Sequence, residues 1–257
     1  MTQSRDQTAV PLVDMRGISR AFGGVAALQN VDLAVHRNEV VALLGDNGAG
    51  KSTLIKCLNG VYRLDSGAIE MDGAPVTIHA PADARALGVE TVYQDLALFD
   101  NLRPTDNFFS GRELAGPAWL PRSLRLLKRK RMVDSTQEVL ERLGVTLPDL
   151  KAVVGLMSGG QRQAIAVSRA AAFASKVVIL DEPTAALGVR ESRNVLDLIL
   201  RLRGENMGVV VVSHAMDHVM EVADRAVVMK RGRNVGEVIP SPETYQQIVS
   251  LIVGGAE

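Results

Sequence analysis

The sequence predicts an α/β fold with a mostly parallel sheet, an N-terminal antiparallel β portion and an inserted helical subdomain. Short apolar runs alternate along the chain with segments of helical periodicity, which is the arrangement of α/β proteins. Several of these runs are continuous rather than alternating, as expected for strands that are covered on both faces. We expect strands at residues 12–18, 31–35, 40–44, 89–93, 177–181, 209–213 and 226–230. We expect helices at residues 51–59, 132–143, 158–174, 190–203 and 215–223.

The length, net charge and cysteine content of the chain limit the classes of protein to which it can belong. The 257 residues can form one large domain, which we expect to span 1–257. The 29 basic and 29 acidic residues cancel, so the overall charge does not indicate nucleic acid as a partner. The single cysteine, Cys57, excludes a disulfide framework and indicates a reducing compartment. The apolar runs are too short to cross a bilayer, so we expect any membrane role to depend on a partner.

The segment after the expected strand 40–44 has the composition of a phosphate-binding loop. It reads Gly45, Asp46, Asn47, Gly48, Ala49, Gly50, Lys51, Ser52 and Thr53. Glycine lets backbone N–H groups approach phosphate oxygens closely, and the helix that follows adds the positive end of its dipole. Lys51 can reach the β- and γ-phosphates, while the Ser52 hydroxyl can ligate Mg²⁺. The pattern therefore predicts a nucleotide triphosphate-binding core.

Two adjacent carboxylates follow another apolar strand, at Asp181 and Glu182. Neighbouring side chains of a strand point to opposite sides, so the two acids are expected to have different roles. Asp181 suits the Mg²⁺ shell, and Glu182 is placed to polarise a water for attack on the γ-phosphate. A strand that merely ends in solvated acids is common, but its combination with a phosphate loop favours the catalytic interpretation.

A third motif opens a long helix with a serine cap and two glycines. Its residues are Ser158, Gly159, Gly160 and Gln161. This pattern predicts a second helix N-terminus that can bind an anion. One nucleotide cannot easily use both anion sites of one molecule. We therefore expect two copies to face each other head to tail, with each ATP between Lys51 of one copy and Ser158 and Gly160 of the other.

These motifs resemble those of the ATP-binding cassette ATPases, and the resemblance covers nearly the whole chain. Met157 precedes the serine where leucine is commoner in that family. The resemblance implies that Gln94 touches Mg²⁺ and the attacking water and meets a transmembrane partner. It also implies that His214 contacts the γ-phosphate and that Phe22 stacks on adenine, although tyrosine is more usual there.

One position departs from the family pattern. The residues after Thr184 read Ala185, Ala186, Leu187 and Gly188, so glycine stands where an aspartate usually links the two protomers. The coupling between the two sites is the property that this change affects. A second interpretation of His214, as a metal ligand with His218, lacks an evident third ligand.

The region between the two halves of the core is expected to differ from them. We assign residues 1–93 and 170–240 to the nucleotide-binding core, 94–169 to a mostly helical subdomain without strands, and 241–257 to a C-terminal helix or tail. The basic segment 122–131 fits a solvated surface, a contact with a partner or lipid headgroups, or single-stranded nucleic acid.

The resemblance implies an ATPase motor subunit of a membrane transporter, peripheral at the cytoplasmic face. The sequence of several short segments is similar to that of the ATPases of bacterial monosaccharide importers of the ribose, xylose and fructose type. This implies transmembrane permease subunits, a second ATPase subunit and, indirectly, a periplasmic or extracellular sugar-binding protein. Leu96, Leu98 and Phe99 fit either a permease groove or ordinary core. The alternatives are a transporter subunit for another substrate, a soluble cassette acting on nucleic acid or translation, and a small-molecule kinase.

Overall fold

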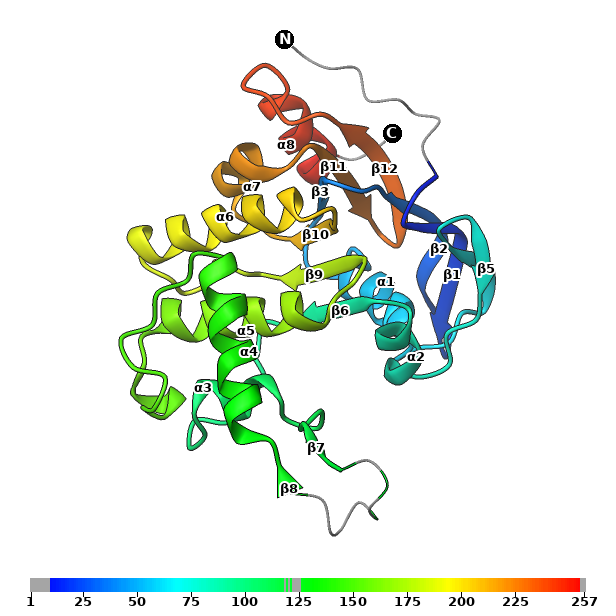
Figure 1. The fold of residues 1–257 in the computed structure, drawn as a ribbon. Coiled ribbons are helices and arrows are strands. Elements are labelled where there is room, and N and C mark those ends of the chain that lie inside the picture. The colour runs from blue at the N-terminus through cyan, green and yellow to red at the C-terminus, as the bar shows by residue number, and fades with distance from the viewer. Residues whose placement is uncertain (1–9, 118, 120, 122–125, 255–257) are drawn as a thin grey trace.

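The computed structural model describes residues 10–117, 119, 121 and 126–254, and its centre is a six-stranded sheet (Figure 1). The strand order is β12-β11-β3-β10-β9-β6, and all pairs are parallel except β11 with β12. This confirms the predicted fold class. The strands are β3 (Glu39–Leu44), β6 (Val89–Val92), β9 (Val177–Asp181), β10 (Gly208–Val212), β11 (Arg225–Lys230) and β12 (Arg233–Val238).

A second, antiparallel sheet forms beside α1 and α2 from the N-terminal part of the chain (Figure 1). Its order is β2-β1-β4-β5, with β1 (Val13–Phe22), β2 (Val25–Val35), β4 (Ser66–Met71) and β5 (Ala74–Val76). The first two strands are longer than the sequence pattern predicts, because they continue to a two-residue turn at Gly23 and Gly24. Phe22 is consequently the last residue of a strand rather than part of the loop that follows it.

The helices are α1 (Lys51–Leu58), α2 (Pro81–Ala86), α3 (Pro104–Phe108), α4 (Arg129–Arg142), α5 (Gly159–Phe173), α6 (Val189–Gly204), α7 (Met216–Val222) and α8 (Tyr245–Val253). They agree with the predicted helices to within three residues at either end; α2 and α3 are additional, and α8 lies in the segment assigned to a C-terminal helix or tail. Within the described part of the chain, no helix combines the length and apolarity that a bilayer crossing requires.

The central sheet is buried on both faces, which explains its continuous apolar strands. Alternate residues of one strand enter different cores: Ile179 joins the core that contains α1 and the antiparallel sheet, whereas Val178 and Leu180 join the core formed with α4, α5 and α6. A third, smaller core lies under α7 and α8. Burial on both sides fixes the sheet, and its strand ends therefore provide rigid positions for side chains.

The segment between β6 and β9 is mostly helical, but the expectation that it contains no strands is wrong. Two-residue strands β7 (Ala115–Gly116) and β8 (Leu126–Leu127) form an antiparallel pair. Hydrogen bonding between these two strands, rather than apolar patterning, defines the pair. Within the basic segment, Lys128 to Arg131 are exposed and form no ion pair with a described residue. Arg122 and Arg125 lie outside the described residues.

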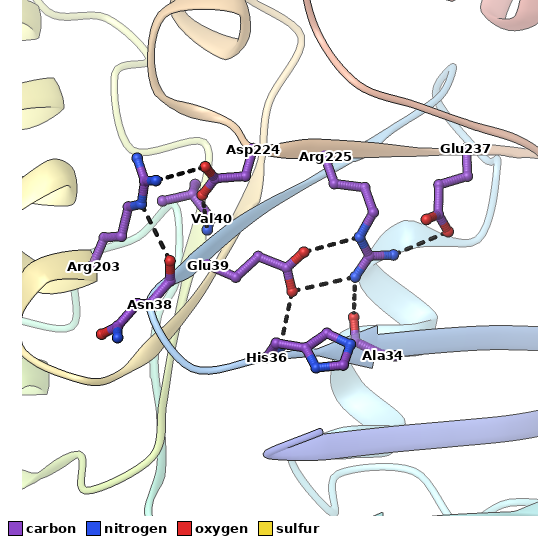
Figure 2. A network of polar contacts seen from close by, with 9 residues as sticks. All are labelled: Ala34, His36, Asn38, Glu39, Val40, Arg203, Asp224, Arg225 and Glu237. Atoms are coloured by element: carbon purple, nitrogen blue, oxygen red, sulfur yellow. Dashed lines mark hydrogen bonds and ion pairs between the residues drawn. The ribbon is translucent and has the colours of Figure 1, made fainter. Parts of the chain in front are cut away.

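A buried ion pair fastens β3 to β11 at the end of the sheet where β3 begins (Figure 2). The Arg225 guanidinium donates to Glu39 Oε1 at 3.0 Å, to the carbonyl of Ala34 at 2.6 Å, and pairs with Glu237. The His36 N–H donates to the same Glu39 carboxylate at 2.8 Å. Burial acts to raise the pKa of Glu39, but Arg225 and this N–H hold it below its ordinary value.

A second set of contacts lies beside this pair and ties α6 to the start of the sheet. Asp224 accepts from the N–H of Val40 at 2.9 Å and pairs with Arg203 at 2.8 Å. Arg203 also donates to the carbonyl of Asn38 (Figure 2). Charged groups thus hold one end of the sheet, and the opposite end remains available for a ligand.

We expect Glu39→Gln to lower the free energy of unfolding by roughly 3 kcal/mol at pH 7, because Arg225 would lose its buried partner. The folded-state pKa of Glu39 is depressed, so its contribution is full above the unfolded-state pKa and disappears as pH falls through the folded-state pKa. The difference between wild type and variant should therefore shrink below about pH 4. Denaturant titrations across this pH range test the expectation.

Glu237→Gln is the matched control, since Glu237 pairs with the same arginine but its side chain is 57% exposed. It should change stability by less than about 1 kcal/mol. Equal losses for the two variants would contradict the assignment of Glu39 as the principal partner.

Candidate nucleotide-binding site

Four neighbouring strands end at one edge of the central sheet, and each delivers a predicted site residue there. In spatial order these strands are β3, β10, β9 and β6. The phosphate loop follows β3, His214 lies two residues beyond β10, Asp181 ends β9, and Gln94 lies two residues beyond β6. Residues far apart in the sequence are therefore gathered at the carboxyl edge, where parallel sheets bind ligands.

Two glycines of the phosphate loop are required by close backbone packing. Gly45 has φ +143°, and a Cβ there would lie 2.2 Å from the Met229 carbonyl oxygen. Gly50 has φ +105°, and its Cβ would lie 2.8 Å from the Ala27 carbonyl oxygen. Gly48, by contrast, faces open space at φ +81°. The loop is consequently tight against the protein on one side and open on the side where a phosphate would lie.

Lys51 extends across the loop from the first turn of α1. Its Nζ donates to the carbonyl oxygens of Gly45 at 2.6 Å and Asp46 at 3.0 Å. An ammonium group has three protons, so one donor is left for a phosphate oxygen. Burial lowers the pKa of Lys51, and the charges of Glu182 and Asp181 act in the opposite direction.

The two carboxylates occupy different backbone environments. Asp181 ends β9, whereas Glu182 adopts a left-handed backbone at φ +51° and donates its N–H to the Val212 carbonyl at 2.8 Å. Burial raises the pKa of both side chains, and Lys51 opposes the shift in each. A raised pKa makes a carboxylate a stronger base, so the Glu182 environment favours proton acceptance from water.

His214 lies directly beside Glu182. Its Nε2 is 3.3 Å from Glu182 Oε1, a buried oxygen whose geometry satisfies no hydrogen bond. His218 is engaged elsewhere, because its Nδ1 lies 2.9 Å from the Thr184 hydroxyl. Among the described residues no three His, Cys, Asp or Glu side chains gather as a metal cluster. Glu182 and His214 thus form a pair close enough to Lys51 of the phosphate loop for its charge to act on Glu182.

The side chains at this edge fit ATP and Mg²⁺. The first N–H groups of α1 have no intrahelical acceptors, and the open side of the loop would place phosphate oxygens against them. The orphaned Glu182 oxygen lacks the partner that a water would supply. Oxygen ligands are what Mg²⁺ prefers, and Ser52, Asp181 and Gln94 offer a hydroxyl, a carboxylate and an amide oxygen.

Phe22 lies at the tip of the β1–β2 hairpin and is 39% exposed. Its ring meets the Tyr62 ring edge to face, with centroids 4.9 Å apart. The predicted role of Phe22 in base stacking needs an accessible face, which this exposure provides. Tyr62 was not among the predicted site residues, because nothing in the local sequence indicates that the end of α1 returns to this hairpin.

The signature segment, residues 158–161, begins α5 and is capped as the sequence predicts. The Ser158 hydroxyl accepts from the Gln161 N–H at 3.3 Å, and Gln161 Oε1 accepts from the Ser158 N–H at 2.9 Å. Within the described chain, no hydrogen bond or ion pair joins this segment to the phosphate loop. One chain therefore does not bring its two anion-binding helix ends into contact.

Helix α6 packs closely on the signature segment. A Cβ on Gly160 would lie 2.6 Å from Glu191 Cγ, and a Cβ on Gly188 would lie 2.6 Å from Glu191 Oε2. The same glutamate therefore fills the space beside both glycines. At position 188 only the mobile end of the Glu191 side chain lies close, so the contact there is less restrictive than the one at Gly160.

The segment after Gln94 is held by a residue that the sequence reasoning missed. Arg169 of α5 donates to the carbonyl oxygens of Leu96 and Ala97 at 3.0 and 2.9 Å. Leu96 and Leu98 are half-buried against the helical core, as ordinary core residues would be, whereas Phe99 is 53% exposed. An arginine within the mostly apolar second half of α5 was the available signal.

The loop, its lysine and the acids of the neighbouring strand define a phosphate-loop protein that binds and hydrolyses a nucleotide triphosphate. The sequence pattern of the ABC transporter family matches residues 28–185, and the chain belongs to that family. It is an ATPase of the ABC type. The fructose import ATP-binding protein FrcA of Rhizobium meliloti is 44% identical, over 96% of this chain and 95% of its own. The xylose/arabinose import ATP-binding protein XylG of Sulfolobus acidocaldarius is 43% identical, over 95% of both chains.

Solved structures share the fold. A nucleotide-free ATP-binding cassette from an ABC transporter superposes with a TM-score of 0.81 at 23% identity, covering 95% of this chain and all of that one. A dimeric post-hydrolysis cassette, MJ0796 bound to ADP and phosphate, has a TM-score of 0.72 at 21% identity, covering 89% and 99%. At these identities the likeness concerns the arrangement of elements.

Proposed function

We propose that this chain is the ATP-hydrolysing motor subunit of an importer that carries a monosaccharide through a separate transmembrane permease. The import of fructose and of xylose or arabinose in the names of its relatives supports the substrate class. The observation that carries the mechanism is the separation of two anion-binding helix ends in one chain, at Lys51 and at Ser158.

In this mechanism two copies pair head to tail around two ATP molecules. The phosphate loop and Lys51 of one copy bind the phosphates, and the α5 N-terminus of the other copy approaches the γ-phosphate from the opposite side. Phe22 stacks on the adenine. Each pocket is complete only in the pair, so ATP binding drives the two copies together.

Glu182 accepts a proton from the attacking water, and His214 orients the carboxylate and contacts the γ-phosphate. Mg²⁺ held by Ser52, Asp181 and Gln94 would neutralise charge on the phosphates when bound. After hydrolysis the γ-phosphate no longer bridges the two copies, and the pair reopens.

The motion reaches the permease through the segment after Gln94. Arg169 joins this segment to α5, whose N-terminus is the signature. Movement of the signature toward a nucleotide would therefore be passed to exposed residues such as Phe99. We place the motor at the cytoplasmic face of the membrane, with a sugar-binding protein acting on the other side.

Sugar uptake into membrane vesicles tests this proposal. Vesicles from cells that express the chain with its genomically adjacent permease should accumulate radiolabelled fructose, xylose or ribose when ATP is supplied inside. Glu182→Gln in the same system should abolish accumulation, because the general base is lost. Detergent-solubilised membranes should yield the chain together with the permease.

Two results would contradict the proposal. Hydrolysis without uptake of any of the three sugars would overturn the substrate class, and purification with nucleic acid or ribosomes instead of a permease would favour the soluble cassette alternative.

A further inference from the structure

The aromatic residue at the expected base site is part of a larger assembly. Phe22 contacts Tyr62 edge to face, and the Arg20 guanidinium lies over the Phe22 ring at 4.9 Å from its centroid. Asp65 pairs with Arg20 at 2.6 Å and accepts from the N–H of Ala21 at 2.7 Å. Three chain segments, from β1, the end of α1 and the start of β4, therefore meet at one exposed ring.

These contacts restrict how the Phe22 ring can lie. A strand-end phenylalanine that is 39% exposed would otherwise exchange between rotamers. The Arg20 guanidinium covers one ring face, so a flat ligand is left with the opposite face. Tyr62 abuts the ring edge to face and limits its rotation.

We infer that Tyr62 is a positioning residue for the nucleobase, acting through Phe22, with Arg20 and Asp65 fixing the other side of the ring. The inference rests on the proposed stacking of adenine on Phe22 and extends it. A pre-oriented ring loses less side-chain freedom when the base arrives, and this raises affinity. The ligand class is a planar heteroaromatic base of a nucleotide.

The ring of Tyr62 carries this role rather than its hydroxyl. That hydroxyl makes no hydrogen bond with the described residues, and Lys56 lies over the ring at 5.5 Å from its centroid. Tyr62 also lies shortly after α1, which ends at Leu58, and its N–H donates to the Lys56 carbonyl. A purely structural role would therefore act on α1 and on the phosphate loop at its other end.

Calorimetric titration of the full chain with ADP and with inorganic pyrophosphate separates the two roles, because only ADP has a base. Tyr62→Leu should weaken ADP binding about threefold to tenfold, the range of an aromatic edge-to-face pair. Pyrophosphate binding should be unchanged. Tyr62→Phe keeps the ring and should bind ADP as wild type does. In a Phe22→Ala background, Tyr62→Leu should not weaken ADP binding any further.

Each remaining outcome counts against a specific claim. If Phe22→Ala binds ADP normally, the proposed base contact fails. If Phe22→Ala is weakened and Tyr62→Leu is not, the positioning role of Tyr62 is wrong while the base contact stands. Parallel losses for ADP and pyrophosphate, or additive effects of the two substitutions, would likewise overturn the inference by assigning Tyr62 to the phosphate loop or to the fold.

Discussion

Glu182→Gln should leave ATP binding intact and lower the turnover number about 10²- to 10⁴-fold, the usual contribution of a general base. The amide occupies the space of the carboxylate but cannot accept a proton from water. Because ATP would persist in the pocket, the variant should accumulate as a closed pair in the presence of ATP and Mg²⁺. Phosphate release and size-exclusion chromatography measure the two effects.

Lys51→Ala provides the contrasting result. It removes the ammonium that lies across the phosphate loop, so nucleotide binding itself should weaken, and no closed pair should form.

If Glu182→Gln hydrolysed ATP at the wild-type rate, the assignment of Glu182 as the general base would be wrong.

Ser158→Arg should prevent ATP-driven pairing and lower turnover about 100-fold, although nucleotide still binds to the phosphate loop. Ser158 is exposed at the start of α5, so a large side chain there would project into the facing copy and obstruct closure. Light scattering of the Glu182→Gln protein with ATP, with and without the second substitution, reports pairing directly.

A matched control is Ser250→Arg, which changes another exposed helical serine but lies on α8, a helix that packs on β11 and β12. It should pair and hydrolyse ATP normally. Pairing by Ser158→Arg at the wild-type level would contradict the head-to-tail arrangement.

The six-stranded sheet was predictable because its strands are encoded by residues that are adjacent in the sequence. Short runs rich in apolar residues identified every parallel strand of the six-stranded sheet, and the serine cap identified the start of α5 at Gly159. The phosphate loop was evident for the same reason, since glycine spacing and Lys51 are adjacent in the chain. The positions of these strand ends followed from their being parallel.

An antiparallel N-terminal portion was predicted, and β1, β2 and β11 were expected at 12–18, 31–35 and 226–230. The antiparallel strands β4, β5 and β12 were missed, because their signals were turns rather than apolar runs. Asp72 and Gly73 join β4 to β5, and Arg231 and Gly232 join β11 to β12, all four with positive φ. Such two-residue turns predict hairpins. Aspartate followed by glycine was the readable signal, whereas arginine at φ +48° is uncommon and is set by tertiary structure.

Contacts between side chains of separate elements could not be predicted from the sequence. Tyr62 meets Phe22 and Arg169 meets Ala97 only because separate elements converge in space. The distinction between Asp181 and Glu182 was predicted from strand alternation, but the structure produces it through the left-handed backbone of Glu182. The two backbone environments differ, and the separate roles of the two acids stay a prediction.

The crowding of Glu191 against Gly160 affects how inactive variants of the signature are interpreted. Any side chain at position 160 would collide with Glu191 of α6. A Gly160 variant can therefore lose activity because α5 and α6 no longer pack correctly. Ser158 is exposed, so a substitution there loses the cap of α5 but otherwise reports on the meeting of two copies. The second glycine of this motif is thus fixed by the architecture of a single molecule before any nucleotide arrives.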